Sequence, residues 1–386
     1  QSFFEKKGVN IKLFHRVEQI IPAKKLLIVR DLMRSEVKEY KYHALVLATG
    51  SSPKKLGFPG ENSRNIFFIK TLDECFALKK YCIENTIKKA VIIGGGYVGM
   101  EMAETLRKKN YCVTILHKHN LPLHGLEDDT REMIRTQLEK NGIEFIPNVT
   151  TEGFLAGKNE VVTHVFTNKG TYEADVIIVS LGVTPNISLA ANAKIRIGKR
   201  GGIITDSRQQ TSVENIFAAG DCCEVKNLVN NQQMFLPLAT LANRQGRVAG
   251  DNAAGGHAKY AGAIRALAFR LFDKEIAQVG ISSAEAQESK IQCTVHRINS
   301  TTAISFMPES EDIFITGIFE KNTNRILGAN LIGGAGTVLR ANILAVTIQQ
   351  KLTAKNISDL DIAYAPQFSP LTDGVITLGN VARKEL

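Results

Sequence analysis

Several features that would place this 386-residue chain in a special class of protein are missing. No apolar segment approaches the ~20 residues that a membrane-spanning helix needs, and nothing at the start resembles a signal peptide. Despite a net charge of +10, no basic run is interleaved with aromatic residues and no nucleic-acid motif is present. We therefore expect a cytoplasmic protein that binds neither membrane nor nucleic acid. Phosphate-rich small ligands or a lysine-rich surface would account for the positive charge.

Cysteines are few and lack the spacing of a metal site or of a disulfide framework. The six are Cys75, Cys82, Cys112, Cys222, Cys223 and Cys293. We expect reduced, mostly buried thiols and no metal centre. The length allows two or three domains with full cores, and 44% hydrophobic and 22% charged residues are ordinary for a globular protein.

The stretch that organises the chain is 89–101, where a β-branched run leads into glycines and then into helix-forming residues. Gly94, Gly96 and Gly99 have the Gly-x-Gly-x-x-Gly spacing of dinucleotide-binding turns. The first makes a tight turn, the second lets the backbone approach a pyrophosphate, and the third allows close packing of helix and strand. A second strand follows at 111–116. We predict a dinucleotide site with its phosphates at the helix N-terminus.

The second strand ends in His117, Lys118 and His119 instead of the acidic residue that holds the ribose 2′-hydroxyl of NAD. A lysine neutralises a 2′-phosphate but cannot accept a hydrogen bond from a hydroxyl. His117 and Lys118 are therefore predicted to favour NADPH over NADH. A solvated basic loop is the alternative.

Two other strand ends suit a ligand. An apolar strand leads into Ala48, Thr49 and Gly50, where the backbone can lie against a flat or phosphate-bearing molecule. A short strand before Gly220 places Asp221 at its carboxyl end, where open α/β sheets bind ligands. A carboxylate there can accept hydrogen bonds from a ribose or ribityl chain, although Asp221 alone could also be a helix N-cap.

Periodicity predicts the remaining elements. We expect a helix tail at 2–7 and strands at 9–13, 11–21, 25–30, 36–42, 44–47, 175–181, 313–319 and 326–332. We expect a hairpin at 161–172 and helices at 72–84, 130–141, 238–252 and 338–351. The pattern becomes strand-rich from residue 261 and ends in a polar tail, which marks a separate C-terminal domain.

Together these motifs resemble the flavin-dependent pyridine nucleotide–disulfide oxidoreductases, and most of all the branch of coenzyme A-disulfide reductases, NADH oxidases and NADH peroxidases. Residues 48–50 resemble a flavin-side turn, 94–101 the nicotinamide-cofactor motif and 219–221 the flavin ribityl motif. Pro237, Leu238 and Ala239 begin a segment similar to the helix that points at the isoalloxazine. Residues 361–366 resemble the tail that the partner subunit lends to the active site.

The resemblance implies an α/β fold with two Rossmann-like domains, one for FAD and one for NAD(P)H, and an α+β C-terminal dimerisation domain. The FAD domain is discontinuous, with segments at 1–72 and 188–258 around an NAD(P)H domain at 73–187. The dimerisation domain takes 259–386. FAD and NADPH (or NADH) are the implied cofactors, and a homodimer completes the active site.

The same resemblance assigns roles near the reacting rings. Tyr97 would be a gate over the flavin, and Glu101 would orient the nicotinamide amide. Tyr364 would lie in a tail that crosses to the partner's flavin, with Pro366 keeping it extended. Gly182, after the buried strand at 175–181, is a further predicted cofactor contact. A core tyrosine and a helix N-terminal acid are the alternatives for the first two residues.

The chain also departs from the family pattern. Members begin with a glycine unit that binds the ADP half of FAD and a helix with the redox cysteine, so we expect an N-terminally truncated chain. None of the six cysteines takes that place. In the tail, Phe368, Thr372 and Ile376 stand where a tyrosine, a lysine and an asparagine are common in coenzyme A-disulfide reductases.

The implied function is NAD(P)H-dependent reduction of a coenzyme A disulfide, a persulfide or a related thiol substrate, through flavin and a redox cysteine absent from this chain. One alternative is an NADH oxidase or peroxidase that acts on oxygen or peroxide. Another is a truncated or degenerate chain without catalysis. The helix at 338–348 is apolar on more than one stripe, and a dimer partner is expected to cover the second face.

Overall fold

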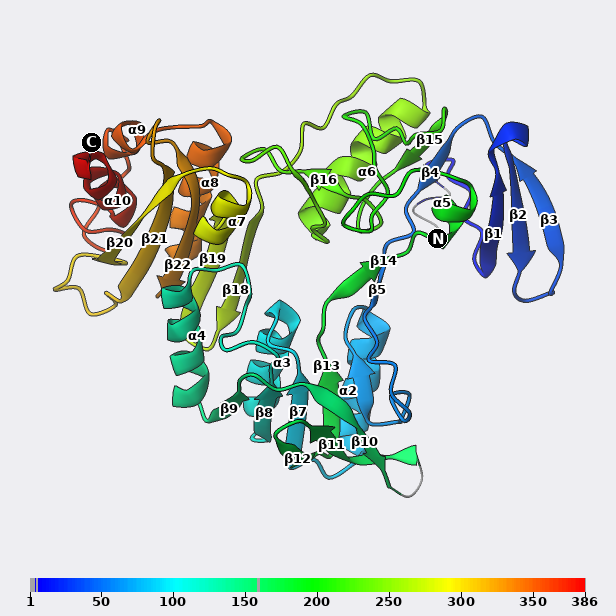
Figure 1. Cartoon of the computed structure of the whole chain (residues 1–386), viewed down its shortest axis with the longest axis horizontal. Coiled ribbons are helices and arrows are strands. Elements are labelled where there is room, and N and C mark those ends of the chain that lie inside the picture. Colours follow the sequence, from blue (N-terminus) through cyan, green and yellow to red (C-terminus); the bar gives the residue numbers. More distant parts are fainter. Residues whose placement is uncertain (1–3, 5, 158–159, 386) are drawn as a thin grey trace. The chain divides into compact units, whose positions relative to one another are not determined.

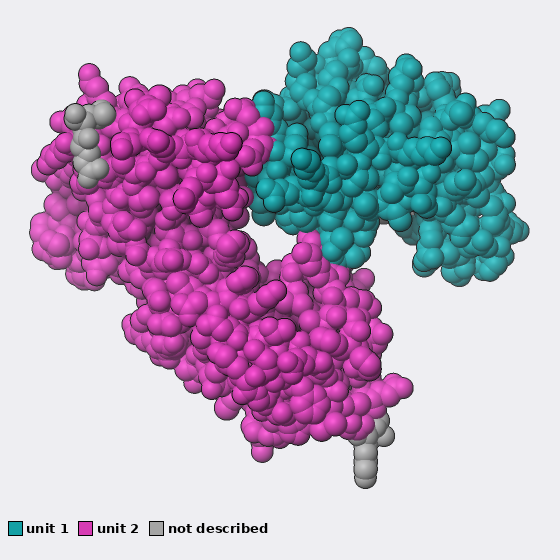
Figure 2. Space-filling view, in the orientation of Figure 1, with its two compact units in different colours: residues 1–52, 184–226, 233–263 teal, residues 53–183, 227–232, 264–386 magenta. Residues whose placement is uncertain are grey.

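The computed structural model describes residue 4 and residues 6–157 and 160–385. The chain divides into two compact units, coloured separately in Figure 2. Unit 1 comprises residues 1–52, 184–226 and 233–263, and unit 2 comprises 53–183, 227–232 and 264–386. The predicted helix tail at 2–7 lies partly outside the described residues, which do not include 2, 3 and 5.

Unit 1 contains an antiparallel sheet and a short parallel pair (Figure 1). In the sheet, β1 (His15–Ile21), β2 (Leu26–Asp31) and β3 (Val37–Lys41) pair in that order. β4 (Leu45–Leu47) pairs in parallel with β15 (Ile216–Ala218), and α6 (Ala239–Ala253) packs on both. The smaller elements are η1 (Pro22–Lys24), α5 (Ser188–Asn192), β16 (Val225–Lys226) and β17 (Gln233–Met234). β5 (Ser51–Pro53) and β14 (Val183–Pro185) form a two-stranded sheet.

The first part of unit 2 is a five-stranded parallel sheet. Its order is β6 (Ile66–Phe68), β13 (Val176–Val179), β7 (Lys89–Ile93), β8 (Cys112–Leu116) and β9 (Ile143–Ile146). Three helices, α2 (Leu72–Glu84), α3 (Tyr97–Arg107) and α4 (Asp128–Lys140), pack on one face, and Ile92 lies in their core cluster. Val91 and Ile93 point to the opposite face, because successive side chains of a strand alternate.

The opposite face is covered by an antiparallel sheet of β10 (Thr151–Ala156), β11 (Val162–Thr167) and β12 (Gly170–Glu173). Burial on both faces explains why β7 and β13 are nearly continuous runs of branched apolar residues. The glycine turn therefore follows a rigid, buried strand.

The second part of unit 2 is a five-stranded antiparallel sheet with helices. Its order is β18 (Ala266–Leu271), β19 (Lys274–Gly280), β22 (Ile326–Gly333), β21 (Asp312–Glu320) and β20 (Cys293–Thr301). The helices are α7 (Ser283–Glu288), α8 (Thr337–Gln349), α9 (Ala354–Ser358), α10 (Gly374–Ala382) and η3 (Arg383–Glu385). Phe269 and Ile276 of this sheet share a core cluster with Met100 of α3 and Ile134 of α4, so the two parts pack as one unit.

The predicted fold class is confirmed, with a parallel Rossmann-like sheet and a C-terminal α+β domain. The predicted helix at 72–84 is confirmed as α2, which starts with a capping box of Thr71 and Glu74. The predicted strand at 9–13 is wrong, since the β1–β2 ladder ends at the pair of His15 and Asp31. The prediction of a polar tail is also wrong, because α10 is apolar and packs on β20 and β21.

Within the described residues, no helix is long and apolar enough to cross a bilayer.

Candidate functional site

The glycines of the motif form the turn between β7 and α3 and the first turn of the helix. Gly94 has a φ of 110°, and a Cβ there would lie 2.3 Å from the carbonyl oxygen of Ser180. A Cβ on Gly99 would lie 2.3 Å from the carbonyl oxygen of Gly94. Strand, turn and helix can therefore pack this closely only without side chains at these two positions.

Gly96 is in a different environment. It is the N-cap of α3, and no side chain caps the helix. The nearest atom to a Cβ on Gly96 would be 3.9 Å away, so the backbone is open on this side. Uncapped N–H groups at the positive end of a helix suit a phosphate group, and this edge fits the pyrophosphate of a dinucleotide.

His117 supports the glycine turn from the end of β8. Its Nδ1 atom accepts a hydrogen bond of 3.0 Å from the N–H of Gly95. Burial, and then the neighbouring His119, lower the pKa of His117 to about 4. The ring is therefore neutral near pH 7 and keeps Nδ1 as an acceptor. Lys118 and His119 follow it and are exposed.

A loop at 121–126 brings another histidine to this edge. The rings of His124 and His119 stack with centroids 5.7 Å apart. The N–H of Leu123 donates to the carbonyl oxygen of Gly95 at 2.9 Å, which ties the loop to the glycine turn. Across the residues described, no group of three or more His, Cys, Asp or Glu side chains could hold a metal ion. Sequence reasoning missed His124 because it lies in a loop outside the motif.

Tyr97 and Glu101 lie one turn apart on α3. The Tyr97 hydroxyl donates to Oε1 of Gln278 at 3.1 Å, and its ring packs edge to face on Phe269. Burial raises the pKa of Tyr97, so this phenol stays protonated. Partial desolvation, and then the Glu104 carboxylate, raise the pKa of Glu101. Gly182 follows β13 with a φ of 84° and open space at its Cβ position.

In unit 1, the turn after β4 is braced by Asn186. The Thr49 hydroxyl donates to the Asn186 carbonyl oxygen at 2.6 Å, and the Asn186 side-chain amide donates to the Thr49 carbonyl oxygen at 2.9 Å. Ala48 is exposed, and Gly50 has a φ of 67° with nothing near its Cβ position. This open, fixed turn fits a flat ligand. Asn186 was missed because an amide in a loop belongs to no local pattern.

Asp221 lies beside the same turn, where its Oδ2 atom accepts a hydrogen bond of 3.0 Å from the Ser51 hydroxyl. The N–H of Gly220 donates to Oε1 of Gln245 at 2.9 Å, which anchors α6 to this strand end. Asp221 is the N-cap of no helix in the described part of the chain, which removes the capping alternative.

The segment Pro237, Leu238 and Ala239 leads into α6. Leu238 is the N-cap, and no side chain caps the helix there. The N–H of Leu241 already donates to the carbonyl oxygen of Leu238, but no side chain takes up the N–H groups before it. This positive helix end suits the electronegative edge of a ligand ring. The turn at Thr49 and Gly50 and the start of α6 together form the candidate site of unit 1, and both fit a flavin cofactor.

The thiols differ from expectation. Cys222 and Cys223 are buried, with sulfur atoms 3.7 Å apart, but Cys75 and Cys112 are exposed, so the prediction of mostly buried thiols is wrong. A hydrogen bond from Cys223 lowers the pKa of Cys222 to about 6. The Cys222 sulfur also contacts the carbonyl oxygen of Leu47, below the turn that follows β4.

The tail between α9 and α10 is exposed at its aromatic residues, with 46% of Tyr364 and 71% of Phe368 accessible. The prediction that Pro366 keeps it extended is wrong. The N–H groups of Phe368 and Ser369 both donate to the Ala365 carbonyl oxygen, at 2.9 and 3.2 Å, and close a turn.

Arg340 of α8 holds this tail. Its buried guanidinium donates to Oδ2 of Asp373 at 2.8 Å and to the carbonyl oxygen of Phe368 at 3.2 Å. Asp373 in turn accepts from the N–H of Val375 and caps α10. The hydrogen bonds offset the desolvation of the buried pair, so α8 and the tail are fixed to each other.

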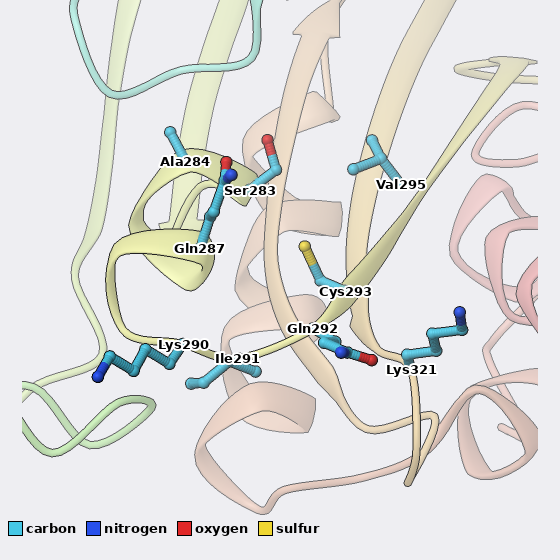
Figure 3. A pocket seen from close by; sticks show the side chains of 9 residues that line it. All are labelled: Ser283, Ala284, Gln287, Lys290, Ile291, Gln292, Cys293, Val295 and Lys321. Atoms are coloured by element: carbon cyan, nitrogen blue, oxygen red, sulfur yellow. The ribbon is translucent and has the colours of Figure 1, made fainter.

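A pocket of about 760 Å³ lies between α7 and β20 in the C-terminal part of unit 2 (Figure 3). None of the predicted site residues lines it. Burial raises the pKa of the Cys293 thiol, which therefore stays protonated near pH 7. The lining residues are Ser283, Ala284, Gln287, Lys290, Ile291, Gln292, Cys293, Val295 and Lys321.

Residues 3–246 match the family model for pyridine nucleotide-disulphide oxidoreductases, and residues 268–373 match the dimerisation domain of that family. The NAD(P)H sulfur oxidoreductase (CoA-dependent) of Pyrococcus abyssi is 30% identical over 384 residues, which cover 99% of this chain and 84% of that protein.

Three solved structures are also similar to this chain. The NAD-dependent persulfide reductase from A. fulgidus has a TM-score of 0.95 at 30% identity, over 100% of this chain and 71% of that chain. The water-forming NADH oxidase from Lactobacillus brevis, bound to NADH, has a TM-score of 0.93 at 28% identity, over 99% and 84%. Its engineered NADPH oxidase variant, bound to NADPH, has a TM-score of 0.94 at 28% identity, over 100% and 85%.

Proposed function

Because the chain belongs to the pyridine nucleotide-disulphide oxidoreductases, a family of NAD(P)H-dependent flavoproteins, we propose that it passes electrons from NADPH to a coenzyme A disulfide, a persulfide or a related sulfur substrate. The observation that carries the proposal is the open glycine turn at the uncapped start of α3, with Lys118 exposed beside it. Similarity to a CoA-dependent sulfur oxidoreductase and to a persulfide reductase supports the acceptor class.

The residues of unit 2 would bind and orient the nicotinamide cofactor. The N–H groups after Gly96 would hold the pyrophosphate. Glu101, one turn along α3 from Tyr97, would accept a hydrogen bond from the nicotinamide amide. Tyr97, a neutral phenol at the helix start, would contact the nicotinamide ring while its hydroxyl stays bonded to Gln278.

The residues of unit 1 would hold FAD, which when bound accepts hydride and releases electron pairs to sulfur. The turn at Thr49 and Gly50 would lie against the flavin side, and Asp221 would accept from the ribityl hydroxyls. The uncapped start of α6, after Pro237, would stabilise negative charge on the ring edge.

The proposal is tested with purified protein supplied with FAD and NADPH without oxygen. NADPH should be consumed only when coenzyme A disulfide or a persulfide is added, with thiol formed in proportion. The similarity to an NADH oxidase makes oxygen the rival acceptor. If NADPH is consumed only when oxygen is present, and at a rate that neither sulfur substrate changes, the oxidase function replaces this proposal. If none of these acceptors leads to consumption of NADPH, both functions are refuted.

NADPH preference has independent support from the engineered oxidase. Its five substitutions are separated by 18, 1, 1 and 5 residues. The same intervals separate Gly99, His117, Lys118, His119 and His124. By this spacing its two introduced arginines fall at the positions of Lys118 and His124, so these two side chains would contact the 2′-phosphate.

Lys118→Glu should weaken NADPH binding about tenfold, ~1.4 kcal/mol, and leave NADH binding equal or better. A carboxylate repels the 2′-phosphate but can accept from a 2′-hydroxyl. Titration of both nucleotides against wild type and variant measures the ratio. Lys79→Glu, at an exposed lysine of α2, is the matched control and should leave the ratio unchanged. An unchanged ratio in Lys118→Glu would mean that the lysine is only a solvated charge.

We also propose a homodimer through the C-terminal domain. α8 packs on β19 and β22 with one face, while Leu339 and Val346 on another face remain 69% and 60% exposed. Phe306 and Leu371, on loops of the same domain, are each 76% exposed. Exposed apolar residues gathered in a dimerisation domain are best explained by a partner that covers them.

A further inference from the structure

Gln278 is a buried polar residue of β19, with 3% of its surface accessible. Its strand belongs to the C-terminal sheet, but both of its side-chain partners belong to the nucleotide-binding part of unit 2. Oε1 accepts from the Tyr97 hydroxyl at 3.1 Å, and Nε2 donates to the carbonyl oxygen of Gly125 at 2.5 Å. One amide thus joins two elements that are 28 residues apart in sequence.

These two elements lie on either side of the glycine turn. Tyr97 begins α3 directly after Gly96. Gly125 belongs to the loop 121–126, in which Leu123 bonds to Gly95 and His124 stacks on His119. Gln278 is therefore bonded to the helix start and to the loop that carries the candidate 2′-phosphate contact.

The loop needs outside contacts to keep its shape. Leu123 has a φ of 53°, in the left-handed region that a leucine rarely adopts, and such a conformation persists only when its surroundings impose it. Arg131 of α4 donates to the carbonyl oxygens of Leu121 and Pro122, both at 2.8 Å. Gln278 adds a restraint at Gly125, from the C-terminal sheet.

We propose that Gln278 is a positioning residue for the nicotinamide cofactor, through which the dimerisation domain holds Tyr97 and the loop 121–126 in the arrangement that binds NADPH. The inference rests on the proposed function. Gln278 acts through Tyr97 and Gly125, since its two bonds go to these residues.

Other contacts keep the two parts of unit 2 together without Gln278. The N–H of Glu127 donates to Oδ1 of Asn330 at 2.7 Å, and the N–H of Phe272 donates to Oε2 of Glu104 at 2.9 Å. Gln137 of α4 also bonds to Asp273 across the same boundary. Variants at Gln278 should therefore fold, and Gln137 offers a matched control that touches neither Tyr97 nor the loop.

The test is the affinity of the full chain for NADP⁺ and NAD⁺, measured by calorimetry, because the oxidised nucleotides bind without reaction. Gln278→Met keeps the length of the side chain and removes both bonds. It should weaken NADP⁺ binding about tenfold, as two ordinary hydrogen bonds allow. NAD⁺ binding should weaken less, since the loop with His124 matters for the 2′-phosphate. In a Tyr97→Phe background the loss should shrink, because one of the two bonds is already gone.

Gln137→Met should leave both affinities unchanged. Equal losses in both glutamine variants, or an unchanged NADP⁺ affinity in Gln278→Met, would overturn the positioning role. If Gln278→Met does not fold, Gln278→Asn carries the same expectation, because the shorter amide cannot reach both partners. Failure of the wild type to bind either nucleotide would instead refute the proposed function itself.

Discussion

Replacing Gly94 with alanine should abolish measurable binding of NADPH and NADH. Gly94 has a φ of 110°, where an L side chain is strained, and the new Cβ would lie 2.3 Å from the Ser180 carbonyl oxygen. That oxygen belongs to the backbone just after β13, a buried strand paired with β7, so it cannot move away easily. The turn would have to shift, and the N–H groups of α3 would no longer face a pyrophosphate together.

The same substitution should lower the free energy of unfolding by about 2–5 kcal/mol, the sum of backbone strain and overpacking. Gly153→Ala is the matched control, since nothing lies within 4 Å of its Cβ position in the same part of unit 2. Calorimetric titration gives the affinity, and denaturant unfolding gives the stability. Nucleotide binding at wild-type strength in Gly94→Ala would show that the turn is not the dinucleotide site.

Placing aspartates at Leu339 and Val346 together should convert the homodimer to a monomer. The two residues are two helical turns apart on one face of α8, and both are exposed in the single chain. Aspartates there leave the monomer soluble, but burying unpaired carboxylates in an apolar interface is costly. The dimer dissociation constant should rise on the order of a thousandfold, ~4 kcal/mol.

Sedimentation velocity at micromolar concentration measures this change. The matched control places aspartates at Leu72 and Ile83, which are 74% exposed on α2, and should remain a dimer. If the variant with both aspartates on α8 still sediments as a dimer, the interface lies elsewhere on the protein. A wild-type chain that is monomeric and fully active would show that the active site needs no residue from a partner subunit.

Local sequence was sufficient for the elements in which neighbours along the chain set the structure. The glycine spacing predicted the turn because Gly94 has a positive φ and a Cβ on Gly99 would meet the carbonyl oxygen of Gly94 within the same motif. The helix at 72–84 was predicted to the residue, since its cap and its apolar periodicity are both local. The bonding of Asp221 to a turn distant in sequence was not predicted, although its place at a strand end was.

Other features were decided by tertiary contacts. Pro366 indicated an extended tail, but the turn at Ala365 formed instead, on a segment clamped by Arg340. His117 was predicted as a cofactor contact, and the fold places its Nδ1 atom on the glycine turn itself. The sequence pattern predicts a polar tail where α10 forms. The apolar residues of α10 are buried only once the folded chain places them against β20 and β21.

The sequence by itself thus determined the class of cofactor, the position of the dinucleotide turn and the parallel sheet behind it. These depend on steric limits and side-chain alternation that act within a few residues. Only the tertiary structure showed that Asn186, His124 and Gln278 belong to the candidate sites. An amide or an imidazole has the same local pattern in a solvated loop as in a buried network, and its role depends on partners that folding brings from far along the chain.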